Sequence, residues 1–84
     1  MFFTYILFST AYDKYYIGQT NDLEDRLYRH NAGSNKSTAP YRPWKIVCTI
    51  PKETRAEAVV LENKLKNLTK ERLRHFIQKY SNSK

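Results

Sequence analysis

Hydrophobic positions along the chain predict three strands. Phe2–Phe8 is apolar without interruption, which is typical of a strand that is covered on both faces. A second strand is expected over Lys14–Gln19, and the short turn-forming segment before it favours a hairpin with the first. The sequence WKIVCTI, Trp44–Ile50, predicts a third strand, which we expect Pro51 to end.

Helical spacing predicts three further elements. The segment TNDLEDRLYRHNAG carries Asn21 or Asp22 as a cap and Gly33 as a stop. A second helix is expected from about Glu53 to Asn67, and Thr69 should cap a last one. The final residues, SNSK, are expected to fray. The predicted order is β-β-α-β-α-α, which is an α+β fold.

The first helix directs polar groups at the sheet. At 100° per residue, Arg26 and His30 fall within about 60° of Leu23, on the same face as Leu27. A long arginine side chain often extends from the edge of an apolar stripe, and a helix histidine is usually structural. Together, however, the two groups offer a fixed charge and a titratable donor on one patch, which suits phosphate recognition.

Two strand tyrosines can face this helix. Tyr5 lies in the first strand, and Tyr16 shares one face of the second with Gly18. Both are core aromatics by default, although a buried tyrosine hydroxyl usually seeks a partner. If they face the helix, their hydroxyls can meet Arg26 and His30, and a phenol among cations could take a proton from water.

Glu62 and Cys48 each allow two interpretations. Glu62 can pair with Lys66 at i+4, or it can be a single carboxylate on a Mg²⁺ or Mn²⁺ ion that keeps most of its waters, and spacing does not choose between these. Cys48 alternates with hydrophobic neighbours in WKIVCTI, which favours a buried strand residue over a thiol nucleophile.

Composition and charge narrow the class of binding partner and the cellular compartment. The 84 residues suit one domain, and the net charge of +7 favours a polyanion, with nucleic acid ahead of an anionic membrane. One cysteine excludes an internal disulfide, so we expect a cytoplasmic protein. The apolar N-terminal segment is too short to cross a membrane and is interpreted as a strand.

The ordered motifs resemble the GIY-YIG endonuclease family. TYIL is followed by YYIG, DLEDRLYRHNAG, RPWKIV and AVVLENKLK, so the resemblance extends over about residues 3–73 and is closest to compact single-domain members. The first motif, FTYIL, departs by lacking the glycine. Some members carry a downstream asparagine near the site, and the sequence leaves open whether Asn63 or Asn67 corresponds to it.

The resemblance implies a three-stranded antiparallel sheet flanked by helices, in one GIY-YIG-like nuclease domain over residues 1–84. It implies hydrolysis of DNA phosphodiesters with one Mg²⁺ or Mn²⁺ ion and suggests structure-specific action in repair or recombination. Glu62 matches the metal carboxylate, Gly18 matches the motif glycine, and the other catalytic positions match Tyr5, Tyr16, Arg26 and His30. Which tyrosine is the base stays open.

Two other function classes fit the same residues. One is a nucleic-acid-binding module without turnover. The other is a nuclease subunit that acts only with a protein partner, which would supply substrate specificity. In each case DNA would contact the basic side chains of Arg29, Lys36, Arg42, Lys45 and Lys70.

Overall fold

The structure is a computed structural model that describes residues 1–81. The predicted element order is confirmed, with a short 3₁₀ helix added before the third strand. Apart from Ser81, the segment expected to fray lies outside the described residues. The elements are β1 (Phe2–Ser9), β2 (Lys14–Thr20), α1 (Leu23–Ala32), η1 (Ala39–Tyr41), β3 (Lys45–Lys52), α2 (Arg55–Lys66) and α3 (Lys70–Ser81).

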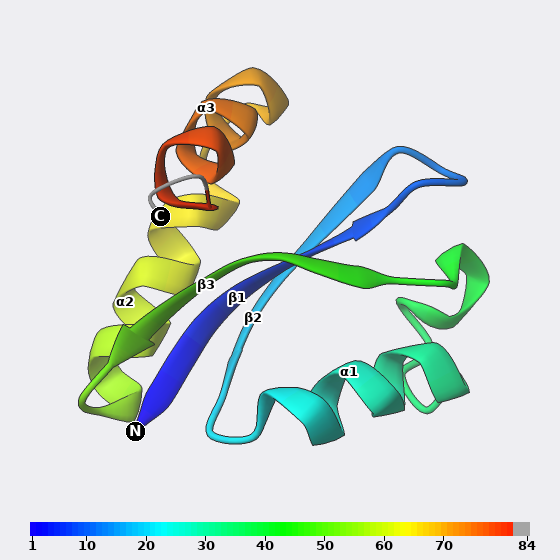
Figure 1. Cartoon of the computed structure of the whole chain (residues 1–84), viewed down its shortest axis with the longest axis horizontal. Coiled ribbons are helices and arrows are strands. Elements are labelled where there is room, and N and C mark those ends of the chain that lie inside the picture. The colour runs from blue at the N-terminus through cyan, green and yellow to red at the C-terminus, as the bar shows by residue number, and fades with distance from the viewer. Residues whose placement is uncertain (82–84) are drawn as a thin grey trace.

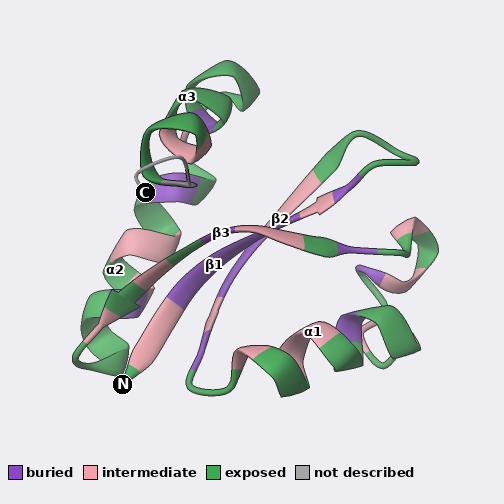
Figure 2. Ribbon diagram, in the orientation of Figure 1, coloured by how far each residue is buried: buried purple, intermediate pink, exposed green. Residues whose placement is uncertain are grey.

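The three strands form one antiparallel sheet in the order β2-β1-β3. β1 is central, and four consecutive residues from Thr4 to Leu7 are buried, which confirms that this strand is covered on both faces. Figure 2 shows the burial concentrated along the strands and on the inner sides of the helices. In the β1–β2 register, Tyr5 lies opposite Gly18 and Leu7 opposite Tyr16.

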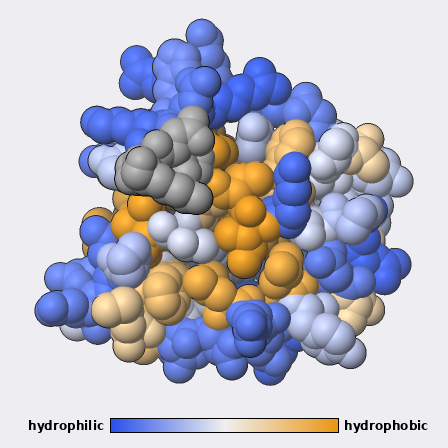
Figure 3. Space-filling view, in the orientation of Figure 1, coloured by the Kyte–Doolittle hydropathy of each residue, from blue (hydrophilic) through white to orange (hydrophobic). Residues whose placement is uncertain are grey.

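Helices cover the two faces of the sheet separately. α1 lies on one side, while α2 and α3 lie on the other (Figure 1). The α1 side holds a core of Tyr5, Leu7 and Trp44, and the opposite side holds a core of Ile6, Ile17, Cys48, Leu65 and Leu73. Figure 3 shows hydrophobic residues at the centre of one face of the molecule, with hydrophilic residues around them.

The regular alternation predicted for WKIVCTI, with Cys48 on the same face as its hydrophobic neighbours, is wrong over part of β3. Ile6 pairs with Cys48 but Leu7 pairs with Ile46, so the register shifts at this point. Val47 is the extra residue of a β-bulge, which turns the strand. As a result Trp44 and Ile46 pack on the α1 side, whereas Cys48 packs on the α2 and α3 side. Cys48 itself is buried, as expected, and unpaired with another cysteine.

Pro51 does not end the third strand, which continues to Lys52. Pro51 lies opposite Phe3 in the register. A proline has no backbone N–H to donate to a neighbouring strand. This loss is tolerated in β3 because β3 is at the edge of the sheet and pairs on one side only.

The helix ends follow the predicted capping. The Asp22 side chain accepts from the Asp25 N–H at 3.1 Å, and Gly33 ends α1 with φ of 84°. Thr54 begins α2 in a capping box with Glu57, and Thr69 accepts from the Arg72 N–H at 3.2 Å at the start of α3. No helix in the described part of the chain is long and apolar enough to span a membrane.

Candidate active site

The sheet brings two tyrosines and a glycine together beneath α1. Tyr5 is almost completely buried, and its ring centroid lies 6.3 Å from that of Tyr16, which is half-buried. A Cβ added at Gly18 would lie only 2.6 Å from the Tyr5 Oη. Gly18 therefore provides the space that the Tyr5 ring occupies.

His30 reaches the sheet from the last turn of α1 and is buried. Its Nε2 lies 3.2 Å from the Tyr5 Oη, and its ring centroid lies 4.7 Å from that of Tyr16. The face predicted for α1 is thus confirmed, since Leu23 and Leu27 pack on the same core. The two tyrosine rings and His30 therefore lie together beneath α1.

Arg26 lies one helical turn before His30 and is half-buried. Its Nε is buried and finds no hydrogen-bond partner among the described residues. The guanidinium of Arg26 also lies close enough to Tyr5 to oppose the rise in its pKa. A buried guanidinium N–H without an acceptor is uncommon, and an anionic oxygen beside it would satisfy it.

Thr38 is a member of this cluster that the sequence analysis did not identify. Its Oγ1 lies 2.8 Å from the His30 Nδ1, and Thr38 is buried. Its backbone carbonyl accepts from the Trp44 indole N–H at 2.9 Å. The segment STAPY carries a turn signal, but nothing local in it indicates a contact with a histidine eight residues earlier.

Asn31 anchors the beginning of β3 to α1. Its side-chain amide donates to the Trp44 carbonyl at 3.0 Å, and its carbonyl oxygen accepts from the Trp44 N–H at 2.6 Å. These two bonds and the indole bond to Thr38 join α1, the η1 segment and β3. The His30 ring is therefore held in a network that connects three parts of the chain.

Glu62 approaches from α2. It pairs with Lys66 at 2.9 Å, which confirms the ion-pair interpretation, and its side chain is 17% exposed against 50% for Lys66. The negative charge of Glu62 and the positive charge of Arg26 both act on the Tyr5 hydroxyl. Glu62 therefore lies close enough to affect the tyrosine cluster electrostatically.

Burial determines the protonation states of Tyr5 and His30. Burial, with a smaller effect of Tyr16, raises the pKa of Tyr5 to about 12, despite the opposing effect of Arg26. Burial and then the charge of Arg26 lower the pKa of His30 below its ordinary value of 6.5. At neutral pH the Tyr5 hydroxyl therefore keeps its proton and the His30 ring is neutral.

The candidate DNA-contacting residues divide into separate groups. Arg29 and Lys36 line a pocket of about 420 Å³ together with Arg26 and His30, although Arg29 also pairs with Asp25 at 3.0 Å. Arg42 lies against Gly33 and its Nε donates to the Ala39 carbonyl at 2.8 Å, while Lys45 is exposed at the start of β3.

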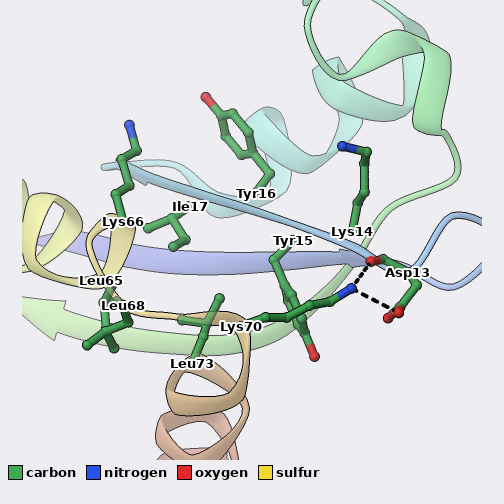
Figure 4. A pocket seen from close by; sticks show the side chains of 10 residues that line it. All are labelled: Asp13, Lys14, Tyr15, Tyr16, Ile17, Leu65, Lys66, Leu68, Lys70 and Leu73. Carbon is green, nitrogen blue, oxygen red and sulfur yellow. Dashed lines mark hydrogen bonds and ion pairs between the residues drawn. The ribbon is translucent and has the colours of Figure 1, made fainter.

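Lys70 does not join that group. Its ammonium contacts the Asp13 carbonyl at 2.7 Å and the Asp13 carboxylate at 2.9 Å (Figure 4). Figure 4 shows a second pocket, of about 460 Å³, where Lys14, Lys66 and Tyr16 project to one side of β2. Lys70 lines this second pocket, so positive charge lies on both sides of the tyrosine cluster.

Comparisons with known proteins identify the family of this chain. The profile of the GIY-YIG catalytic domain family matches residues 1–81. A UPF0213 protein of Bacillus velezensis is 37% identical over 70 residues, covering 82% of this chain and 71% of that protein. The UPF0213 protein YazA of Bacillus subtilis is 34% identical over 73 residues, covering 86% and 74%.

A solved structure has the same fold. The solution NMR structure of a UPF0213 protein from Bacillus halodurans matches with a TM-score of 0.63 and 25% identity, over 99% of this chain and 89% of that one. The likeness therefore extends to the whole described fold, including the strands and helices that carry the tyrosine cluster.

Gly18→Ala should destabilise the fold by about 1–3 kcal/mol, since the new methyl group would displace the buried Tyr5 ring from His30. Urea unfolding measures the change. Part of the loss should disappear in a Tyr5→Phe background, because the closest clashing atom is then missing. A Gly18→Ala protein as stable as the wild type would contradict this account of the glycine.

Stability should decrease as pH falls below about 6.5. The unfolded chain protonates His30 at its ordinary pKa, whereas the folded chain resists protonation because its pKa is lowered. The stabilisation is complete above that pH and is lost as pH falls toward the folded-state pKa. Urea unfolding between pH 7.5 and pH 5 measures this, and His30→Gln should remove the dependence that His30 contributes. An equal slope in both proteins would refute it.

Proposed function

This chain belongs to the GIY-YIG catalytic domain family, and from that premise we propose that it is a divalent-metal-dependent endonuclease that hydrolyses DNA phosphodiester bonds. The observation that carries the proposal is the buried Arg26 Nε, which has no hydrogen-bond partner among the described residues and lies near a neutral Tyr5–His30 pair. A phosphate oxygen is the acceptor that this donor suits best, because a guanidinium binds phosphate through charge-assisted hydrogen bonds. A purely structural arginine would be satisfied within the fold.

Arg26 would stabilise the transition state. Negative charge grows on the non-bridging oxygens while water attacks phosphorus, and a fixed guanidinium at that position neutralises it. Since Arg26 is half-buried, its charge is less screened by water than an exposed arginine would be. Arg29 and Lys36, in the same pocket, would hold the neighbouring phosphates.

Tyr5 and His30 would remove the proton from the attacking water. With a pKa of about 12, Tyr5 is not a phenolate at neutral pH and cannot be a base by itself. Its hydroxyl contacts His30 Nε2, so the water proton can pass to the Tyr5 oxygen while the Tyr5 proton passes to His30. Tyr16 is the more exposed tyrosine and would orient the water or the phosphate.

Glu62 suits a hard divalent cation as an oxygen donor. The described residues contain no group of three or more histidine, cysteine or acidic side chains that could hold an ion by themselves, so an ion on Glu62 would keep waters and use substrate oxygens. A bound Mg²⁺ or Mn²⁺ would stabilise charge on the leaving oxygen. Lys66 neutralises the carboxylate and must be displaced by the ion or share it.

The kind of DNA structure that this protein prefers is a separate proposal. The second pocket places Lys14 and Lys66 on the same side of β2 as Tyr16, which supports contact with a strand that extends from the site (Figure 4). We propose structure-specific cleavage in repair or recombination, with a protein partner supplying further specificity. A cleavage assay on linear, nicked, flap and four-way-junction DNA with Mg²⁺ or Mn²⁺ compares the substrates directly.

Glu62→Ala should abolish cleavage while DNA affinity stays the same or increases. The loss should be at least about a hundredfold in rate, since metal stabilisation is worth several kcal/mol, whereas removing a carboxylate reduces repulsion of phosphates. Single-turnover cleavage and fluorescence anisotropy measure the two effects separately. Glu71→Ala, which removes an exposed carboxylate from α3, is the matched control and should cut normally. Cleavage by Glu62→Ala at the wild-type rate would refute the role of Glu62.

Affinity for duplex DNA should decrease steeply with salt. If about four cations engage phosphates, the slope of log K against log salt should be near −3.6, at roughly −0.9 per contact. Anisotropy titrations between low and moderate salt give the slope, and the Lys36→Gln substitution should make it less negative by about one contact. Affinity that does not change with salt would contradict both the nuclease and the binding-module hypotheses.

A further inference from the structure

We propose that Thr38 is a positioning residue that holds His30 in the tautomer protonated at Nδ1, so that Nε2 remains free to accept the Tyr5 proton. This inference rests on the proposed function for its catalytic consequence. The tautomer itself does not depend on catalysis and can be measured separately.

The hydrogen bonds of the Thr38 hydroxyl indicate the protonation of His30 Nδ1. The hydroxyl has a single proton, and the Asn35 carbonyl lies 3.3 Å from Oγ1. A carbonyl can only accept, so this contact is a hydrogen bond only when the Thr38 hydroxyl donates to it, and we infer that it does. The 2.8 Å contact between Oγ1 and His30 Nδ1 must then be donated by the histidine. Nδ1 therefore carries the proton.

The contacts at Tyr5 lead independently to the same tautomer. The Tyr5 hydroxyl hydrogen-bonds to His30 Nε2 at 3.2 Å, and the guanidinium of Arg26 lies close enough to influence its pKa. Arginine has no acceptor, so the hydroxyl proton can go only to Nε2. A buried hydroxyl with no acceptor would be unfavourable. Nε2 must therefore lack a proton, which again leaves the proton on Nδ1.

The surrounding fold keeps Thr38 in place. Its carbonyl accepts from the Trp44 indole, and the Trp44 backbone is bonded on both sides by the Asn31 side chain. Thr38 is buried, so water does not compete for its hydroxyl. The position of this one hydroxyl is therefore set by α1 and β3 together.

The tautomer matters because of the direction in which the proton moves. A His30 ring protonated at Nε2 would donate to Tyr5 and could not receive its proton. The hydroxyl of Tyr5 would then have no acceptor beside it, and the transfer from water through Tyr5 to His30 would be blocked. Thr38 thus acts on the reaction through His30, without contacting substrate.

The experiment measures the His30 tautomer by nitrogen-15 NMR on histidine-labelled protein, in wild type, Thr38→Val and Thr38→Ser. His75, the second histidine of the chain, is exposed and provides an internal reference in every spectrum. Wild type should show Nδ1 protonated and Nε2 free. Thr38→Val should shift the population toward Nε2–H, which an unconstrained histidine side chain prefers, and Thr38→Ser should retain the wild-type pattern.

Thr4→Val is the matched control. Thr4 is as buried as Thr38 and its hydroxyl also donates to a carbonyl, that of Ala58 at 2.8 Å, but it has no contact with His30. Thr4→Val should therefore lose a buried hydrogen bond and leave the His30 tautomer unchanged. Cleavage should decrease about 10- to 100-fold in Thr38→Val, the size usual for the loss of a histidine's outer partner, and be largely retained in Thr38→Ser.

The outcomes separate the two proposals. Nε2 protonated in wild-type protein would overturn the inference without any variant, so it is testable even if Thr38→Val does not fold. An unchanged His30 spectrum in folded Thr38→Val would overturn it as well. If the tautomer responds as expected but wild type cuts no nucleic acid with either metal, the positioning role stands and the proposed nuclease function fails.

Discussion

The hydrogen bond between Tyr5 and His30 constrains the whole α1 side of the molecule. Both groups lie between the sheet and α1, where each would cost about 1–3 kcal/mol if left without a partner. The hydrogen bond between these two groups therefore fixes the position of α1 along the sheet. The same bond explains why position 18 carries no side chain, since the Tyr5 ring occupies that space.

The two halves of the domain differ in what holds them together. On the α2 and α3 side, aliphatic residues and a thiol pack against one another, and the contacts are non-directional. On the α1 side, tyrosine, histidine and tryptophan combine apolar area with directional bonds. A polar core of this kind is sensitive to small displacements. Asn31 in α1 and Thr38 in the loop after it reduce that sensitivity, because both bond to Trp44, the residue directly before β3.

Sequence periodicity predicted the parts of the site that depend on local geometry. The helical period placed Arg26 and His30 on the inner face, and the two-residue period placed Tyr16 with Gly18. Thr38 was missed because its contact depends on how a loop closes, which no local pattern encodes. The bulge at Val47 was missed for a similar reason, since no glycine marks it.

The ion pair of Lys70 shows that the partner of a charged side chain cannot be predicted from local sequence either. Its position on a basic helix suggested contact with DNA, but Asp13, which lies in the turn between β1 and β2, takes its ammonium. Exposed pairs of this kind contribute little to stability, so Asp13 can release Lys70 to a phosphate at small cost. Glu62 differs, because its carboxylate is mostly buried and is therefore harder to leave without a cation.

A small domain gains little stability from a polar cluster between sheet and helix. An apolar set of similar volume in place of the Tyr5, Arg26 and His30 side chains would avoid their desolvation, and buried ionic groups are often no more stable than such replacements. The unpartnered Arg26 Nε has no structural benefit to offset its cost. Departures from stable packing of this kind are expected at functional sites. The raised pKa of Tyr5 then restricts the chemistry, because a phenol that keeps its proton at neutral pH must pass it on as it accepts another. His30 is the group in position to receive it.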